Sequence, residues 1–314
     1  MPEHDPGTIE CCICHQRLLP PYQTLGGRAY CAQHFAVVNR PHTGFWRATA
    51  FQFVGIAALA ALVAFAANLI GPISGPGLII AGVLLAILPS ALWLVFFYQQ
   101  DRLEPEPKHR VAAVFLLAAL LTDVFARRII GEWFRLSEWA PYSDLTSLLS
   151  SILIVGVTYQ AIVYLAVRLL VYNTAEFDER MDGIVYGTVA GLGVAMVTNL
   201  NYVLANDGVA LGPGVVATVT TALAAASFGG LQGWFMAEAK FAHKPVWWVP
   251  AGFALATLLN GVFSWLIGEV SAVGLQVDPW RSLLMGLAVA LGAFLVLAAL
   301  MRRSTEVTLR RAGR

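Results

Sequence analysis

The stretch Glu176–Tyr202, EFDERMDGIVYGTVAGLGVAMVTNLNY, decides the fold of this chain. It passes from a short charged loop directly into an apolar helix. Gly183, Gly187 and Gly191 recur at every fourth position, so they lie on one helix face. A ridge of small residues lets the backbone of a neighbouring membrane helix come close. We therefore predict a transmembrane helix that packs through this face and carries polar residues around Asn199 at its far end.

Composition places the whole chain in a membrane. Of its 314 residues 58% are hydrophobic and only 12% are charged, with a mean hydropathy of +0.69. Soluble domains carry about 25% charged residues. The net charge of +1 and the absence of a basic stripe with interleaved aromatic residues predict no nucleic-acid binding.

All four cysteines lie near the N-terminus, in the segment CCICHQRLLPPYQTLGGRAYCAQHF. Cys11 and Cys14 form a CxxC, and Cys31 and His34 form a CxxH after a short predicted hairpin. Two such turns supply the four ligands of a closed structural zinc site. The neighbouring Cys12 and His15 leave the exact ligand set open, and the alternatives to zinc are a disulfide or free thiols. The segment resembles a LIM-type zinc module, so a role in protein recruitment is implied.

Eight apolar segments follow, each close to the twenty or so residues that cross a bilayer. We predict the spans Trp46–Ile70, Gly77–Tyr98, Val111–Ala126, Thr146–Tyr172, Gly183–Leu204, Val215–Met236, Val246–Val270 and Leu283–Met301. The aromatic segment Arg127–Asp144 is expected to be an interfacial helix or a re-entrant cap. The fold class is therefore all-α, a polytopic membrane protein of about eight helices with a small zinc module.

The distribution of Lys and Arg predicts the orientation. With the N-terminus in the cytoplasm, sixteen of the 20 Lys and Arg residues fall on the inner side and four on the outer side. This bias follows the positive-inside rule, so both termini are expected in the cytoplasm. A reducing compartment favours a metal over a disulfide at the cysteines. The organisation predicted is a module at 1–40, a linker and two spans at 41–100, a membrane core at 101–270, and a last span with a basic tail at 271–314.

Three motifs connect this core to a known family. They are DRLEPEP at 101–107, EFDE at 176–179 followed by MDGIVYG and GLG, and AEAKF at 237–241. Together they resemble the PrsW family of intramembrane metalloproteases, part of the wider group that includes the CAAX-processing and bacteriocin-processing enzymes. The resemblance covers roughly Asp101 to Asn260. It implies a bacterial protein, expected in the plasma membrane.

The resemblance also implies a catalytic set: a Glu-Glu pair with a Lys three residues on, a Phe-xxx-Glu, a lone His and a His-xxx-Asn. Glutamate and histidine serve there as metal ligands or general bases. Counted from the matching motifs, the ionisable positions of that set are occupied here by Tyr159, Gln160, Val163, Thr198, Ala225 and Ala256, and only Asn260 is retained. Hydroxyl and amide groups do not replace a glutamate base.

Three functions follow as hypotheses. The first is a pseudoprotease that binds membrane-anchored proteins in the former catalytic cavity and recruits partners through the zinc module. The second is an active protease with a divergent site, for which Glu176, Glu179 and Asp182 are the nearby acids. The third is a structural or assembly subunit of a membrane complex. Each polar residue of the cavity also has the simpler interpretation of a hydrogen bond between helices.

Overall fold

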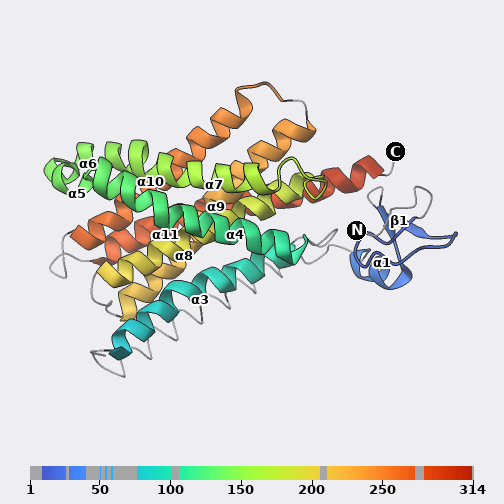
Figure 1. The fold of residues 1–314 in the computed structure, drawn as a ribbon, viewed down its shortest axis with the longest axis horizontal. Coiled ribbons are helices and arrows are strands. Elements are labelled where there is room, and N and C mark those ends of the chain that lie inside the picture. Colours follow the sequence, from blue (N-terminus) through green and yellow to red (C-terminus); the bar gives the residue numbers. More distant parts are fainter. Residues whose placement is uncertain are drawn as a thin grey trace.

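The computed structural model describes residues 9–25, 28–39, 76–100, 106–205, 211–242, 244–272 and 279–312, with the single positions 50, 54 and 58. A small N-terminal module is followed by a bundle of long helices (Figure 1). In the module, β1 (Gln23–Leu25) and β2 (Arg28–Tyr30) form an antiparallel hairpin, and α1 (Ala32–Val38) follows. Tyr30 and Val38 are its buried core. The all-α membrane fold with a small N-terminal module is confirmed.

The long helices follow the predicted spans closely. Their bounds are α3 (Pro76–Gln100), α4 (Lys108–Leu121), α7 (Val157–Leu170), α8 (Arg180–Ala205), α9 (Leu211–Phe241), α10 (Trp248–Ala272) and α11 (Pro279–Ala312). Within the described residues, five helical stretches are long and apolar enough to cross a membrane: 144–170, 180–204, 214–241, 248–268 and 284–308. The predicted first span, Trp46–Ile70, falls almost entirely outside the described residues.

The region between α4 and α7 differs in detail from the prediction. Helical structure continues from α4 through two π-helical segments, η1 (Thr122–Ala126) and η2 (Arg128–Trp133), so the helix runs without a break past Ala126, the predicted end of the third span. The short elements α5 (Leu136–Trp139) and η3 (Ala140–Tyr142) follow.

The fourth span then begins two residues earlier than predicted, with α6 (Asp144–Ser150) and η4 (Ser151–Gly156) continuing into α7. Ser143 and Thr146 form a reciprocal capping box at its first turn. Such a box satisfies backbone N–H groups that have no partner inside the helix.

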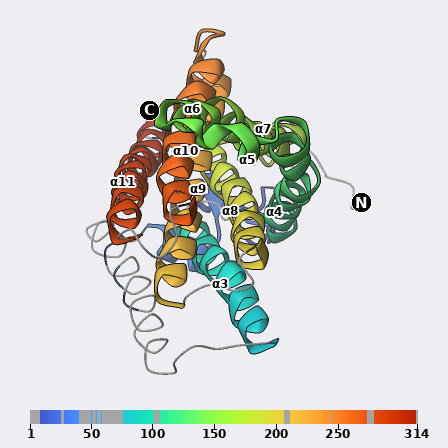
Figure 2. The same cartoon turned by 90° about the vertical axis from the view of Figure 1, so that its left-hand side faces the viewer.

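Helices α8 and α9 form the centre of the bundle, as the end-on view shows (Figure 2). In their most apolar 18-residue stretches, 83% of α8 and 78% of α9 is buried, against 33% in the stretch that contains α7 and in α11. Helices α3, α4, α7 and α11 pack around α8. The central pair therefore has little surface left for lipid.

The glycine face of α8 is the surface on which α9 packs. A Cβ atom built on Gly187 would collide with the carbonyl oxygen of Gly229, and one built on Gly229 would collide with that of Gly187. Gly183 has the same relation to Gly233, and Gly191 meets the carbonyl oxygen of Ala225. The two backbones touch directly, which only glycine permits at these positions.

Candidate functional site

A cavity of about 190 Å³ lies inside the bundle between α7, α8, α9 and α10. Four of the positions singled out in the sequence line it, each from a different helix: Tyr159, Thr198, Ala225 and Asn260. The close approach of α8 and α9 at their glycines brings Thr198 and Ala225 to the same side of the cavity. Helices α7 and α10 form its other walls. The structure thus brings residues from four separate spans around one internal space.

The polar groups in this cavity are neutral. The side chain of Tyr159 interacts with Thr198, whose Oγ1 donates to the carbonyl oxygen of Val194 at 2.8 Å. Across the cavity, Ser264 Oγ lies 3.2 Å from Asn260 Oδ1 and donates to it. These hydroxyl and amide groups donate and accept hydrogen bonds, but they do not exchange protons near neutral pH.

The remaining predicted positions lie outside the cavity lining. Gln160 is buried between helices, and its backbone carbonyl accepts a hydrogen bond from Gln232 Nε2 at 3.1 Å. Asn199 Nδ2 donates to a backbone carbonyl of α9. Val163 and Ala256 are buried apolar residues. Asn199 therefore bonds between helices, the simpler of the two interpretations the sequence allowed, whereas the side-chain Oε1 of Gln160 is buried with no hydrogen-bond partner among the described residues.

The described residues that line the cavity include none of the usual ligands of a catalytic zinc ion. Among the described residues that line it, none carries a carboxylate, an imidazole or a thiol. These are the groups that bind zinc in proteins. In the described part of the chain, a cluster of three or more such side chains close enough to share one ion is found only in the N-terminal module.

That cluster consists of Cys11, Cys14, Cys31 and His34, whose candidate ligand atoms all lie within 4.8 Å of one another. His34 Nδ1 is 3.5 Å from Cys11 Sγ and 3.2 Å from Cys31 Sγ. A tetrahedral ion with bonds of about 2.3 Å to sulfur and 2.0 Å to nitrogen separates such atoms by roughly 3.5 Å. The four side chains therefore form a group that can hold one metal ion.

Local structure explains why these four residues converge. Cys31 immediately precedes α1 and His34 lies in its first turn, so the two side chains share one face.

Burial acts to raise the pKa of the Cys11 thiol, but hydrogen bonds from backbone groups of Cys31, Cys14 and Ile13 outweigh it and lower that pKa to about 6. A thiol of this kind is readily available as a thiolate, the form that binds metals.

Two spare donors are placed elsewhere. Cys12 packs against the small core around Tyr30, and burial raises the pKa of its thiol. His15 lies in the turn after the CxxC with φ of 54°. Neither belongs to the cluster of four.

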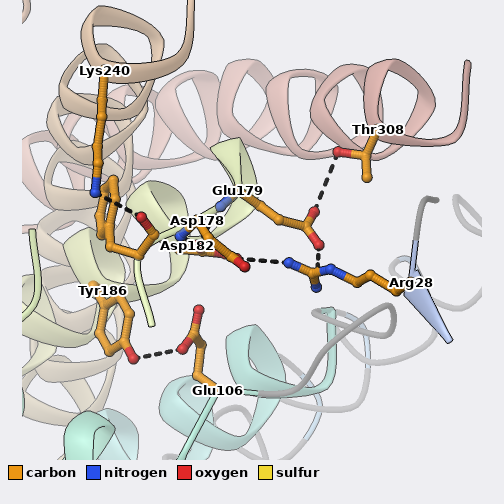
Figure 3. Close-up of polar contacts among 9 residues, drawn as sticks. Arg28, Glu106, Asp178, Glu179, Asp182, Tyr186, Lys240 and Thr308 are labelled. Carbon is orange, nitrogen blue, oxygen red and sulfur yellow. Dashed lines mark hydrogen bonds and ion pairs between the residues drawn. The ribbon is translucent and has the colours of Figure 1, made fainter. Parts of the chain in front are cut away.

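A second polar assembly lies where the module meets the bundle (Figure 3). Arg28 of β2 pairs with Asp178 at 2.7 Å and with Glu179 at 2.5 Å, both in the loop between α7 and α8. Thr308 of α11 donates to Glu179 at 3.2 Å. The carboxylate of Glu179, just before the first residue of α8, thus contacts both the N-terminal module and the last helix, α11.

The same loop is fixed from inside the bundle. Asp182 Oδ2 accepts hydrogen bonds from the backbone N–H groups of Asp178 and Glu179, at 2.7 and 2.6 Å. Lys240 Nζ of α9 donates to the backbone carbonyls of Tyr172 and Phe177, each at 2.7 Å. The EFDE motif and the Lys of AEAKF are therefore parts of one loop anchor.

Glu106 and Tyr186 complete this assembly, and the sequence did not single them out. Tyr186 donates to Glu106 Oε2 at 2.5 Å, and both side chains are buried. Their presence in two of the three motifs, DRLEPEP and MDGIVYG, was the available signal. The family motifs thus meet in space at one end of the core.

The charges of this assembly influence one another. Burial raises the pKa of Glu179 above its ordinary value, and Arg28 opposes that effect. Burial lowers the pKa of Arg28, but Glu179 and Asp178 more than compensate and raise it. The side chains of Arg28 and Glu179 are only 16% and 9% exposed, so this ion pair is largely removed from water.

Comparison with known proteins locates the core of this chain in a family. The model of the PrsW family intramembrane metalloprotease matches residues 106–301. Protease PrsW of Geobacillus kaustophilus is 33% identical over 188 residues, which cover 58% of this chain and 77% of that protein. Protease PrsW of Bacillus subtilis is 29% identical over 191 residues, or 59% and 82% of the two chains. No solved structure matches the chain.

The matched region begins at Glu106 and includes the cavity and the loop anchor, whereas the Cys/His module lies before it. The family match therefore concerns the membrane core. On this match, the chain belongs to the PrsW family of intramembrane metalloproteases.

Proposed function

We propose that this protein is a PrsW-family pseudoprotease that binds membrane-anchored proteins without cleaving them. One observation carries the proposal: Tyr159, Thr198, Ala225 and Asn260 surround the cavity at the positions where the family resemblance implies the catalytic groups. The residues present do not fit a catalytic metal, because hydroxyl, methyl and amide groups offer no anionic or imidazole ligand. Hydrolysis in a bilayer needs a base to activate water, and the described residues of this lining supply none.

The alternative of an active site built from Glu176, Glu179 and Asp182 has weaker support. Asp182 accepts two backbone hydrogen bonds, and Glu179 is engaged by Arg28 and Thr308. These carboxylates hold the loop in place. They do not converge on a shared ion within the described residues.

For the module we propose a structural zinc ion bound by Cys11, Cys14, Cys31 and His34. Three thiolates and one imidazole form a closed set with no position left for a substrate. The same fold fixes the position of Arg28, because the strand that carries it, β2, ends next to Cys31. The module then acts as a platform for protein partners, anchored to the core through the α7–α8 loop, on the cytoplasmic side of a bacterial plasma membrane.

Cleavage is tested with purified protein in lipid nanodiscs and a single-span reporter that Protease PrsW of Bacillus subtilis cleaves under the same conditions. We expect no product from this protein, with or without added zinc. Zinc-dependent cleavage that a chelator abolishes would disprove the pseudoprotease.

Binding is tested with a photo-crosslinking amino acid at Ala225 inside the cavity, with the exposed Leu153 as the matched control position. We expect the reporter to crosslink at position 225 and not at 153. Equal crosslinking at both positions would mean that the cavity does not bind the reporter. A stable, stoichiometric partner set in mild detergent would instead support the role of an assembly subunit.

A further inference from the structure

A second and larger cavity, of about 590 Å³, lies between α7, α9 and α10. Tyr164 and Arg168 of α7, with Tyr172 just after it, form one wall. Met236 of α9 and Phe253 of α10 lie on the other walls. It shares no lining residue with the cavity at Ala225, so it is a separate site.

The cavity lies beside a surface that faces lipid. Leu165 and Leu169 flank Arg168 on α7 and are 41% and 68% exposed. On α10, Leu255 and Leu258 are exposed as well. Large apolar side chains on the outside of a spanning helix contact acyl chains in a bilayer.

Arg168 lies two residues from the end of 144–170, a stretch long and apolar enough to span a membrane. Long basic side chains near the end of such a helix reach the headgroup region. Its guanidinium carbon is 4.3 Å from the centroid of the Tyr172 ring, and Nη1 donates to Asn173 Oδ1 at 3.2 Å. Both partners are neutral, and no carboxylate forms an ion pair with Arg168 in the described part of the chain. Among the described residues that line this cavity, Arg168 is the only charged one.

The neighbouring loop has the character of an interfacial anchor. Val246 and Trp247 are 95% and 60% exposed, and Lys244 Nζ lies 4.9 Å from the centroid of the Trp248 ring. Tryptophan and lysine at the end of a spanning helix are typical of the headgroup region. The cavity thus lies between the exposed leucines, which would contact acyl chains, and the loop with Lys244 and Trp247, which would contact headgroups.

We infer that this cavity binds one anionic phospholipid. Its phosphate pairs with Arg168, and an acyl chain lies along Met236, Val249 and Phe253. A cation without a counter-ion at headgroup depth attracts an anion, and basic pockets between spanning helices bind anionic headgroups. The volume is within the range of about 300–1,000 Å³ found for small-ligand pockets.

The inference is tested by native mass spectrometry of the full chain, released from nanodiscs that contain equal phosphatidylglycerol and phosphatidylcholine. We expect one retained phosphatidylglycerol per chain. Arg168→Ala should weaken that retention roughly tenfold, the effect of losing about 1.4 kcal/mol of charge-assisted hydrogen bonding. Arg303→Ala, an exposed cation on α11, is the matched control and should retain the lipid as the parent does. Arg168→Lys should restore part of the binding.

A second variant tests the apolar half of the site without changing charge. Val249→Trp fills the cavity and should also remove the retained lipid, while a thermal melt shows whether the bundle is intact. Equal retention of both lipids, or equal loss in the Arg168 and Arg303 variants, would overturn the inference. Displacement by millimolar inorganic phosphate or by the single-span reporter would also overturn it, in favour of a free anion or a peptide site.

Discussion

Arg28 of the N-terminal module and Glu179 of the α7–α8 loop form an ion pair across 151 positions of sequence, with Nη1 and Oε1 2.5 Å apart (Figure 3). Arg28 is three residues before Cys31, a member of the metal cluster, and Glu179 is three residues before Asp182, which fixes the loop of the family motif. The pair therefore joins the part of the chain outside the family match to the part inside it. This relationship gives the first prediction.

Arg28→Ala should release the module from the core. Removing the cation leaves Glu179 buried without its ionic partner, which costs about 2 kcal/mol. Hydrogen exchange should quicken in residues 28–39 and in the α7–α8 loop. Arg17→Ala changes an exposed arginine of the same module and should have no such effect. Unchanged exchange in the Arg28 variant would mean that the pair does not hold the module.

Zinc content should depend on Cys31 and not on Cys12. Cys31→Ser removes one of the four clustered ligands, so bound zinc should fall from one per chain to near zero in the purified protein. Cys12→Ser, one position from a ligand, should keep the metal because its side chain packs with the small core. Elemental analysis measures both. Loss of zinc from both variants to the same extent would contradict the assigned ligand set.

Gly187→Ala and Gly292→Ala should change stability in opposite directions. A Cβ at Gly187 meets the backbone of α9, which cannot give way locally, so we expect a loss of about 1–3 kcal/mol. A Cβ at Gly292 in α11 meets nothing within 4 Å, so alanine should stabilise the helix by about 0.5–1 kcal/mol. Thermal unfolding in detergent compares them. Similar behaviour of the two variants would argue against the direct contact of α8 with α9.

The burial of Glu179 should make stability depend on pH. Burial raises the pKa of Glu179 in the folded protein, so the folded state binds this proton more tightly than the unfolded chain does. The resulting stabilisation is complete below the ordinary glutamate pKa near 4.5 and is lost as pH rises through the raised pKa. From about pH 4.5 to about pH 7, the melting temperature of the parent should therefore fall more than that of Glu179→Gln. Glu138→Gln, at a 64% exposed side chain, serves as the control and should follow the parent.

The spans of the core could be predicted from the sequence because a helix that crosses a membrane is encoded locally. Runs of apolar residues set α8 and α9, and the spacing of Gly183, Gly187 and Gly191 marked the face on which they meet. The sequence predicted a third span that ends at Ala126 and then an interfacial helix or a cap, but not that η1 and η2 would continue from α4 to Trp133 without a break, since hydropathy falls there while helical hydrogen bonding continues.

The sequence by itself determined the helical membrane fold, the family of the core and the Cys/His spacing, since each depends on residues within a few turns of one another. Tertiary structure alone decided that Thr198 faces a cavity while the adjacent Asn199 bonds to α9. It also decided that Arg28 forms an ion pair with Glu179, and that Arg168 lies in a pocket without a counter-ion among the described residues. The physical reason is that helix rotation and docking are set by packing between distant segments, and a single chain's local pattern does not record which segments will touch.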